Sequence, residues 1–371
     1  MSAVAWTHTS SAQQVIFGAG RRAELPALLR SLGVQRAMLV TTAGRLESDD
    51  GQQLVRSLDS RLGSTFGEVE SHVPTNVVQA AHLQARRDGV DAVVSFGGGS
   101  CADLGKAVCF FVEQEAGTPG ASFADHPGLV HVAVPTTYSG AELTPFFGMT
   151  DPATRQKSGA GGPTIAPTAV VYDVELGRST PASVRAGTGL NALAHCVEIA
   201  WSPYRTPEAE AIGLFGAGRI FDALPAAVAD LDDDDAATAM LEGACLAGRC
   251  LSNGSMGVHH GLAQVLGGRT GLPHGTSNAL LLEHSIRFNA EAVPDEVRRI
   301  GAAIGAPDDP AGAIAELVAG LEGLPPGLAA AGVTEEDIDV VARLSQGNGS
   351  VQANPRPVSE DDARDILTAA L

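Results

Sequence analysis

Aromatic residues and positive charge are scarce in this 371-residue chain. Aromatic residues make up 4% of it, and 43 acidic residues outnumber 24 basic ones, which gives a net charge of −19. A surface that binds nucleic acid or anionic membranes needs clustered Lys and Arg, so this charge argues against both partners. The five cysteines form no Cys-x-x-Cys pair and are odd in number, which favours free thiols in a reducing cytoplasm.

Long apolar runs and targeting signals are also missing. No uncharged apolar run approaches the ~18 residues of a membrane span, and the start, MSAVAWTHTSSAQQVIF, lacks a basic segment followed by an apolar one. We therefore expect a soluble, cytoplasmic protein. With 44% hydrophobic and 18% charged residues the chain is globular, and its length favours two domains.

Strand-like and helix-like segments alternate in the first half. Short apolar runs predict four buried strands, at residues 36–42, 92–96, 131–135 and 169–172. Segments of helical period lie between them, such as 79–87. This alternation predicts βαβ units with a parallel sheet.

The pattern of apolar residues changes near residue 180. Strand-like runs become rare, and long Ala- and Leu-rich stretches such as 208–224 and 238–251 favour helices. We therefore expect an α/β domain with a parallel sheet over residues 1–178. An all-helical domain over residues 179–371 would follow it.

A glycine-rich loop comes directly after one predicted strand. It contains Gly97, Gly98, Gly99 and Ser100. Glycines let a backbone approach an anion closely, and the start of the helix expected over 102–112 would offer free N–H groups. Ser100 is a candidate cap of that helix, with Asp103 in its first turn. A phosphate site and a plain turn are both compatible with this loop alone.

A second loop, after the next predicted strand, carries hydroxyl groups. Its side chains include Thr136, Thr137, Tyr138 and Ser139. Ligands of open α/β sheets bind at the carboxyl ends of the strands. The two loops therefore reinforce each other and favour a nucleotide site.

Three histidines stand out in the second half. His195 lies four residues after Asn191, on one face of a predicted helix, and His260 and His274 follow at wider spacing. Such a set could bind a metal ion. Hydrogen-bonded histidines of a core are the alternative.

Together these motifs resemble the iron-containing alcohol dehydrogenase superfamily and, more narrowly, its maleylacetate reductases. The matching segments are Gly97–Ser100, Pro135–Pro145, Val171–Leu176, Asn191–Glu198, His259–His260, Pro273–His274 and Asn354–Arg356. The resemblance runs through almost the whole chain, from Phe17–Gly20 onward. It implies an N-terminal α/β dinucleotide-binding domain, a C-terminal helical domain (the dehydroquinate-synthase-like fold) and a homodimer.

The resemblance also implies a reaction: NAD(P)H-dependent reduction of the carbon–carbon double bond of maleylacetate, a small dicarboxylate, to 3-oxoadipate in aromatic-compound catabolism. The implied catalytic residues are His195, His260, His274, Asn191 and Tyr138. The implied cofactor-binding residues are Thr42, Gly97, Gly98, Gly99, Ser100, Asp103, Thr136, Thr137 and Lys157.

The resemblance leaves the anion-binding residues less defined. Arg356 and Arg249 are candidates for the substrate carboxylates, together with Lys157. Where strictly NAD-using relatives have an acid, this chain has the neutral Thr42, with Arg45 close by, so we expect both NADH and NADPH to be used.

Metal-dependent relatives place an Asp and three His around Fe or Zn, and Asn191, His195, His260 and His274 correspond to them. Because Asn is a neutral, weaker ligand, we expect no metal. Gln264 stands where a second-site His is usual, and the segment 273–278 also departs from the family pattern. The alternatives are a metal-dependent alcohol or polyol dehydrogenase, a cofactor-binding homologue without catalysis and, more distantly, a dehydroquinate-synthase-like lyase.

Overall fold

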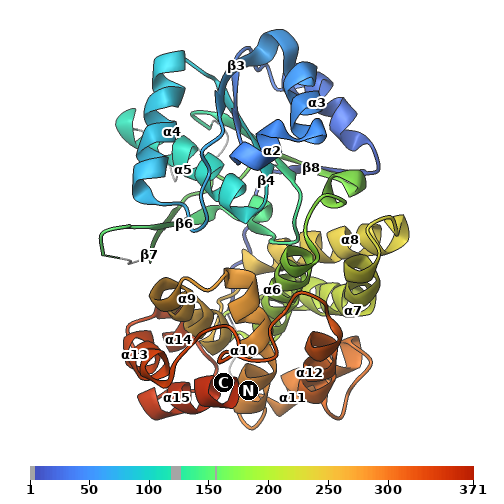
Figure 1. Ribbon diagram of the computed structural model, residues 1–371, viewed down its shortest axis with the longest axis vertical. Helices are drawn as coiled ribbons and strands as arrows, with labels where there is room; N and C mark the ends of the chain where they lie inside the picture. Colours follow the sequence, from blue (N-terminus) through green and yellow to red (C-terminus); the bar gives the residue numbers. More distant parts are fainter. Residues whose placement is uncertain (1–4, 118–126, 155–156) are drawn as a thin grey trace. The chain divides into compact units, whose positions relative to one another are not determined.

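The chain forms two compact units in the computed structural model, which describes residues 5–117, 127–154 and 157–371 (Figure 1). Ser10–Ser179 form an α/β unit, and Thr180–Leu371 form a helical unit. The predicted fold class, an α/β part with a parallel sheet followed by an all-helical part, is confirmed.

The described N-terminal residues 5–9 group with the helical unit rather than with the α/β unit. The backbone N–H of Thr9 donates to Asn253 Oδ1 at 2.8 Å, and Asn253 Nδ2 donates to the Thr9 carbonyl at 2.9 Å. From the sequence we expected these residues in the first domain, because no local pattern shows a contact across 244 positions. A boundary between independently folding domains after Arg178 stays a prediction.

The α/β unit is built on a six-stranded parallel sheet in the order β1-β8-β5-β4-β2-β3. Its strands are β1 (Gln14–Gly18), β2 (Ala37–Val40), β3 (Leu62–Phe66), β4 (Ala92–Gly97), β5 (Val130–Pro135) and β8 (Ala169–Asp173). The four predicted strands are confirmed as β2, β4, β5 and β8. β1 and β3 were missed because Gln, Gly, Ser and Thr interrupt their apolar runs.

Helices cover both faces of this sheet. The helices of the unit are α1 (Leu25–Ser31), α2 (Ala43–Glu47), α3 (Asp49–Leu58), α4 (Thr75–Asp88) and α5 (Gly99–Glu115). Short 3-10 turns are η1 (Arg21–Glu24), η2 (Asp59–Arg61), η4 (Ala141–Leu143) and η5 (Val174–Gly177). An antiparallel hairpin, β6 (Phe146–Thr150) and β7 (Lys157–Gly161), lies outside the sheet.

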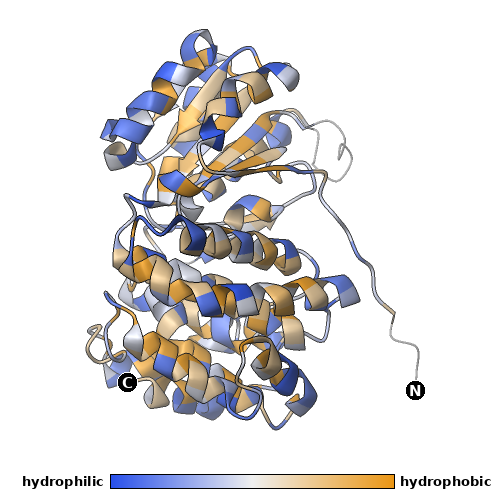
Figure 2. Cartoon of the chain, turned by 90° about the vertical axis from the view of Figure 1, so that its right-hand side faces the viewer, coloured by the Kyte–Doolittle hydropathy of each residue, from blue (hydrophilic) through white to orange (hydrophobic). Residues whose placement is uncertain are grey.

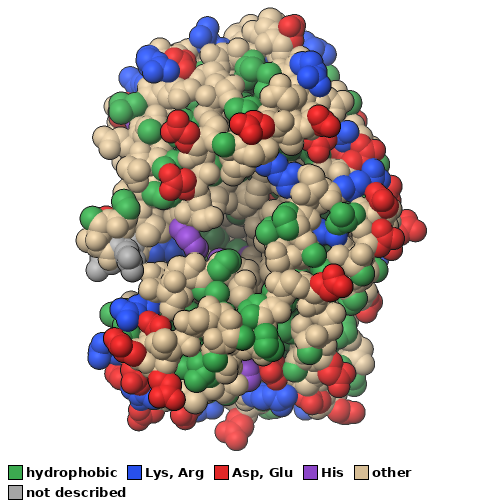
Figure 3. Space-filling view, in the orientation of Figure 1, with side chains coloured by type: hydrophobic (Ala, Val, Ile, Leu, Met, Phe, Trp, Pro, Cys, Tyr) green, Lys and Arg blue, Asp and Glu red, His purple; other side chains and the backbone are tan. Residues whose placement is uncertain are grey.

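Alternate residues of each strand enter two separate apolar layers. Met38 and Val93 pack with side chains of α4 and α5, whereas Leu39 and Val94 pack with α1 and α3. This two-sided burial explains why the strands are continuous apolar runs, which is typical of parallel sheets. Figure 2 shows hydrophobic strands between helices with hydrophilic outer faces. On the face shown in Figure 3, acidic and basic side chains are interspersed over each unit.

The helical unit contains the predicted helices over 208–224 and 238–251, as α7 and α8. Its helices are α6 (Ala182–Trp201), α7 (Pro207–Ala229), α8 (Asp234–Leu251), α9 (Val258–Thr270), α10 (His274–Asn289), α11 (Pro294–Ala303), α12 (Pro310–Gly320), α13 (Glu335–Ser345), α14 (Gly349–Gln352) and α15 (Glu360–Ala369). By length and composition α7 could cross a membrane, as core helices of soluble proteins also could, and 44% of its apolar window is buried.

Two glycines let α6 and α10 cross at backbone contact. A Cβ atom added to Gly275 would lie 2.7 Å from the Gly187 carbonyl carbon, and one added to Gly187 would lie 3.1 Å from Gly275. Since His274 begins α10, this close crossing sets the position of its ring relative to α6.

The crossing predicts the effect of a single methyl group. Gly275→Ala should lower the stability of the helical unit by about 1–3 kcal/mol, because backbone atoms cannot yield as a flexible side chain does. Gly320→Ala is the matched control, since a Cβ atom there meets nothing within 4 Å. Chemical unfolding of both variants measures the difference, and equal stabilities would contradict the close crossing.

Candidate active site

A polar stripe runs along the buried helix α6. Asn191, His195 and Glu198 follow one another at spacings of four and three residues, which places them on one face. Asn191 and His195 are each 5% exposed, and Glu198 is fully buried. Buried polar groups need hydrogen-bond partners, so this face requires polar atoms from neighbouring helices.

Helices α9 and α10 bring two further histidines to this stripe. The His260 ring stacks on His195, with centroids 4.6 Å apart and planes inclined by 12°. His274 is the first residue of α10, and its ring centroid lies 6.0 Å from that of His260. The structure therefore brings together the four residues Asn191, His195, His260 and His274, which we call the histidine cluster.

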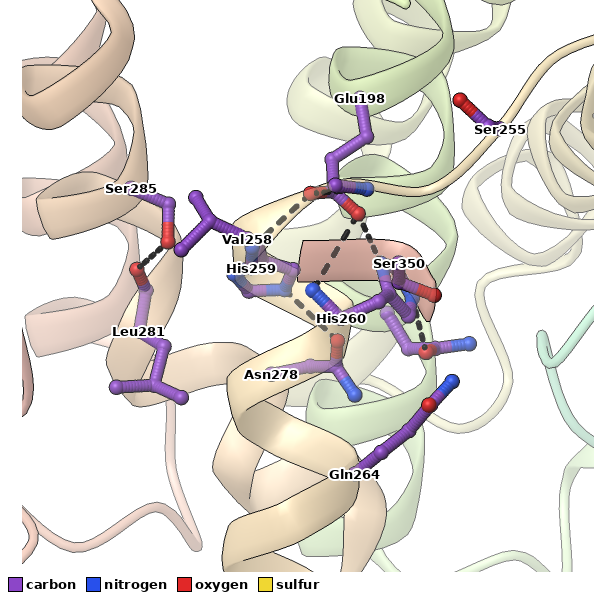
Figure 4. Close-up of polar contacts among 12 residues, drawn as sticks. Glu198, Ser255, Val258, His259, His260, Gln264, Asn278, Leu281, Ser285 and Ser350 are labelled. Carbon is purple, nitrogen blue, oxygen red and sulfur yellow. Dashed lines mark hydrogen bonds and ion pairs between the residues drawn. The ribbon is translucent and has the colours of Figure 1, made fainter. Parts of the chain in front are cut away.

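Both nitrogens of His260 face oxygen atoms. Nδ1 lies 2.6 Å from Glu198 Oε2, and Nε2 lies 3.3 Å from Asn191 Oδ1. Figure 4 shows the contact with Glu198, and it shows His259 turned away toward Asn278, whose Oδ1 lies 2.7 Å from His259 Nε2. His259 therefore belongs to the core packing, whereas His260 belongs to the cluster.

Burial determines the charge of this region. It lowers the pKa of His195 well below the usual value, and the neighbouring His260 and His259 lower it further. The Nδ1 atom of His195 has no hydrogen-bond partner among the described residues. Burial raises the pKa of Glu198, and three backbone N–H groups and His259 oppose that shift. His195 is thus a neutral imidazole, able to donate one hydrogen bond but not to act as a cation.

The glycine loop ends β4 in the α/β unit. Gly97 has φ 138°, a value that favours glycine, and a Cβ atom there would lie 2.7 Å from Cys101 Sγ. A Cβ atom on Gly98 would lie 3.2 Å from Thr137 Cγ2, and one on Gly99 would lie 3.0 Å from Ser139 Oγ. The two loops predicted to form one site are therefore in contact.

The cap predicted at the start of α5 is wrong. The helix begins at Gly99, with Gly98 before it and no side-chain cap, so Ser100 is already inside the first turn. Asp103 consequently lies in the second turn, where its Oδ1 accepts from Lys106 Nζ at 2.8 Å. The reason is that the helix begins earlier than the predicted residue 102, at Gly99, which the prediction left in the loop.

The remaining cofactor candidates lie around these loops. Thr42 caps α2 by accepting from the Arg45 N–H at 3.3 Å, and Arg45 Nη1 donates to Ser179 Oγ at 2.6 Å. Lys157 begins β7, and its side chain crosses Gly148, where a Cβ atom would lie 2.8 Å from Lys157 Cε. Thr136, like Thr137, is buried.

Three further residues of the predicted site belong to neither the histidine cluster nor the glycine loop. Tyr138 is buried in the α/β unit, and Arg249 is exposed in the last turn of α8. Arg356 Nη1 donates to the Phe288 carbonyl at 3.1 Å, and its guanidinium lies 4.1 Å from the Phe288 ring centroid. Their proposed roles stay predictions.

Glu198 is the residue that our site prediction missed. In the sequence we used Glu198 only as the last residue of the matching segment Asn191–Glu198. Its spacing of three residues from His195, which places both side chains on one helix face, could have identified it. Gln264, which replaces the usual histidine, lies one turn after His260, and its Oε1 accepts from Asn348 Nδ2 at 3.3 Å.

Two family models match this chain. The iron-containing alcohol dehydrogenase model matches residues 12–174, and the model of the C-terminal part of the Fe-containing alcohol dehydrogenase family matches residues 185–371. The chain belongs to the iron-containing alcohol dehydrogenase family. The resemblance on which our sequence analysis relied is thus confirmed.

Within this family the chain is similar to maleylacetate reductases. Maleylacetate reductase 2 from Cupriavidus pinatubonensis is 37% identical over 358 residues, covering 96% of this chain and 94% of the relative. The crystal structure of maleylacetate reductase from Agrobacterium tumefaciens is 32% identical, with a TM-score of 0.87 and coverage of 99% and 98%. Sulfoacetaldehyde reductase from Bifidobacterium kashiwanohense, solved in complex with NAD+, is 26% identical, with a TM-score of 0.89 and 99% coverage of both chains.

The buried neutral state of His195 predicts a pH effect. Its pKa is depressed in the folded chain, so stability is present above the unfolded value of 6.5 and is lost as the pH falls below it. This residue should contribute a loss of about 1.4 kcal/mol per pH unit below that point. Unfolding free energies of wild type and His195→Asn at several pH values measure it, and identical pH slopes would contradict a neutral His195.

Proposed function

We propose that this protein is an oxidoreductase that reduces the carbon–carbon double bond of maleylacetate with NADH or NADPH, giving 3-oxoadipate. The observation that carries the proposal is the histidine cluster, which gathers Asn191 and three imidazoles in one buried place. The full-length similarity to maleylacetate reductases supports the choice of substrate.

The glycine loop fits a dinucleotide. Because α5 starts without a side-chain cap, the N–H groups of its first turn are suited to a pyrophosphate. Thr137 Oγ1, beside Gly98, is buried without a hydrogen-bond partner among the described residues, and a cofactor oxygen would supply one. When bound, the nicotinamide supplies the hydride. The loop residues Gly97–Ser100, with Thr136 and Thr137, would hold its phosphates.

The histidine cluster would stabilise the charge that the hydride creates. When hydride adds to the alkene carbon β to the ketone, negative charge develops on the ketone oxygen. Preorganised hydrogen-bond donors aimed at that oxygen lower the barrier. His260, held between Glu198 and Asn191, is the donor that we place there, and neutral His195 orients the ring by stacking on it.

We infer that this chemistry uses no metal, although the name of the family implies iron. Asn191 contributes a neutral amide, and the rings of His195 and His260 are nearly parallel, so their in-plane lone pairs do not converge on one ion. Among the described residues, no group of three or more His, Cys, Asp or Glu side chains is arranged to hold an ion. The residues present do not fit iron.

The finer assignments stay predictions. Arg356, Arg249 and Lys157 remain candidates for the substrate carboxylates. A homodimer, a cytoplasmic location and a role in aromatic-compound catabolism remain expectations drawn from the sequence.

The proposal predicts the product. Maleylacetate should be consumed together with NADH or NADPH, and the ketone should survive in the product while the double bond is lost. We expect both cofactors to support turnover, with a preference below about a thousandfold, equivalent to ~4 kcal/mol. Cofactor oxidation together with mass spectrometry and NMR of the product measures this.

Either of two outcomes would contradict the proposed function. Turnover of simple aldehydes or polyols with none of maleylacetate would indicate an alcohol dehydrogenase. Tight NADH binding without turnover of any enone or carbonyl would indicate a homologue without catalysis.

The glycine loop predicts a loss of cofactor binding in Gly98→Val. The new side chain would occupy the approach to the loop and press on Thr137, so NADH affinity should fall by at least about 100-fold, or ~2.7 kcal/mol. Gly44→Ala, which meets nothing within 4 Å, is the control. NADH fluorescence titration measures affinity and circular dichroism checks folding; a folded Gly98→Val with unchanged affinity would remove this loop from the site.

A further inference from the structure

Glu198 uses both carboxylate oxygens on the start of helix α9. Oε1 accepts from the backbone N–H groups of Gly257 at 2.9 Å and of His259 at 3.0 Å. Oε2 accepts from the His260 N–H at 3.3 Å and faces His260 Nδ1 at 2.6 Å (Figure 4). A carboxylate at a helix N-terminus satisfies N–H groups that lack helical partners and opposes the helix dipole favourably.

Asn354 completes this cap. Its Oδ1 accepts from the Val258 N–H at 3.2 Å, so four successive N–H groups, from Gly257 to His260, are all bonded by two distant side chains. A Cβ atom on Gly257 would lie 2.7 Å from Asn354 Oδ1 and 3.0 Å from Glu198 Oε1, so only glycine fits there. The backbone turn that carries His260 is therefore held by the cap, while the direction of its ring is set by the Nδ1 contact with Glu198.

The hydrogen bonds of His260 require a proton on each side of the ring. A carboxyl and an imidazole 2.6 Å apart hold one proton between them, on either atom. Nε2 faces the oxygen of Asn191, an acceptor, so we assign a hydrogen to Nε2. The other rings around His260 are those of His195, stacked on it, His259, edge-on with centroids 5.0 Å apart, and His274.

We propose that Glu198 is a positioning residue for the reduction: it holds Nδ1 of His260 together with a shared proton, so that the Nε2–H, which faces Asn191 Oδ1 before substrate binds, passes to the substrate as the donated proton. The proposal rests on the proposed function. In the step, hydride adds to the alkene carbon, and the Nε2 proton passes to the resulting enolate. The shared proton then settles on Nδ1, leaving a neutral His260 and a Glu198 carboxylate, so the pair loses one proton and the substrate gains a hydride and a proton.

Glu198→Gln separates this role from capping. Glutamine has the same length, and its oxygen keeps the bonds to Gly257 and His259 while its NH2 group faces Nδ1, so of the capping bonds only the 3.3 Å bond from the His260 N–H is lost. That group cannot supply a proton to the ring. We expect kcat with maleylacetate to fall at least about 100-fold, the usual contribution of a general acid, while KM and the NADH dissociation constant change less than about threefold.

Asn354→Ala is the matched control. It removes the bond to the Val258 N–H, on the same helix start, and the bonds to Asn289 and to the Arg356 carbonyl, but no contact with the His260 ring. The KM for maleylacetate shows whether the loss of the Arg356 bond disturbs substrate binding. We expect a lower melting temperature and a kcat within about threefold of wild type. If kcat of Glu198→Gln also stays within about threefold, or if both variants lose kcat in parallel with melting temperature, Glu198 is only a cap and the proposal is overturned.

A spectroscopic readout makes the proposal independent of the substrate. In 15N-histidine NMR spectra, His260 of the wild type should carry hydrogen at Nε2, with a shared proton at Nδ1, and Glu198→Gln should lose the Nδ1 proton. If wild type fails to reduce maleylacetate, the proposed function fails, and this readout alone decides the role of Glu198. If Nε2 of His260 in the wild type carries no hydrogen, the proposal is overturned.

Discussion

The helical unit depends on one constraint: α6 is buried along most of its length, yet Asn191, His195 and Glu198 line one of its faces. Each buried polar group left without a partner would cost about 1–3 kcal/mol. The start of α9 supplies N–H groups and the His260 ring, and the crossing at Gly187 and Gly275 brings the start of α10 close. The hydrogen bonds of one polar stripe thus hold α9 against α6, the glycine crossing holds α10, and the stripe contributes Asn191 and His195 to the histidine cluster.

The α/β unit is organised by a comparable buried group. Lys106 is fully buried, and its ammonium contacts Asp103 Oδ1 and the Ala141 carbonyl at 2.8 Å and Thr144 Oγ1 at 3.0 Å. These bonds tie α5 to the segment that follows the second loop. The loop glycines then pack against Thr137 and Ser139, so the backbone that would receive a pyrophosphate is set before any ligand binds. Such preorganisation lowers the ordering cost of binding.

Local patterns predicted what local forces determine. The apolar runs of β4 and β5 and the spacing of Asn191 and His195 were readable because burial and helix period act over a few residues. The cap of α9 was not readable, since Glu198 lies 59 to 62 positions before the N–H groups that it bonds. For the same reason Asn253, which holds the N-terminal segment through Thr9, and the Lys106 ammonium could be found only in the fold.

The neutral Asn191 and the Glu198–His260 pair together suggest how a member of a family named for iron could reduce an enone with a hydride from the nicotinamide and a proton from His260, in place of a metal ion. The most direct test is the turnover of maleylacetate by protein stripped of metal, with the metal content verified by mass spectrometry. The account predicts that kcat and KM remain those of the untreated enzyme and that added Fe²⁺ or Zn²⁺ brings no gain. Loss of activity on stripping, restored by one equivalent of metal per chain, would contradict it.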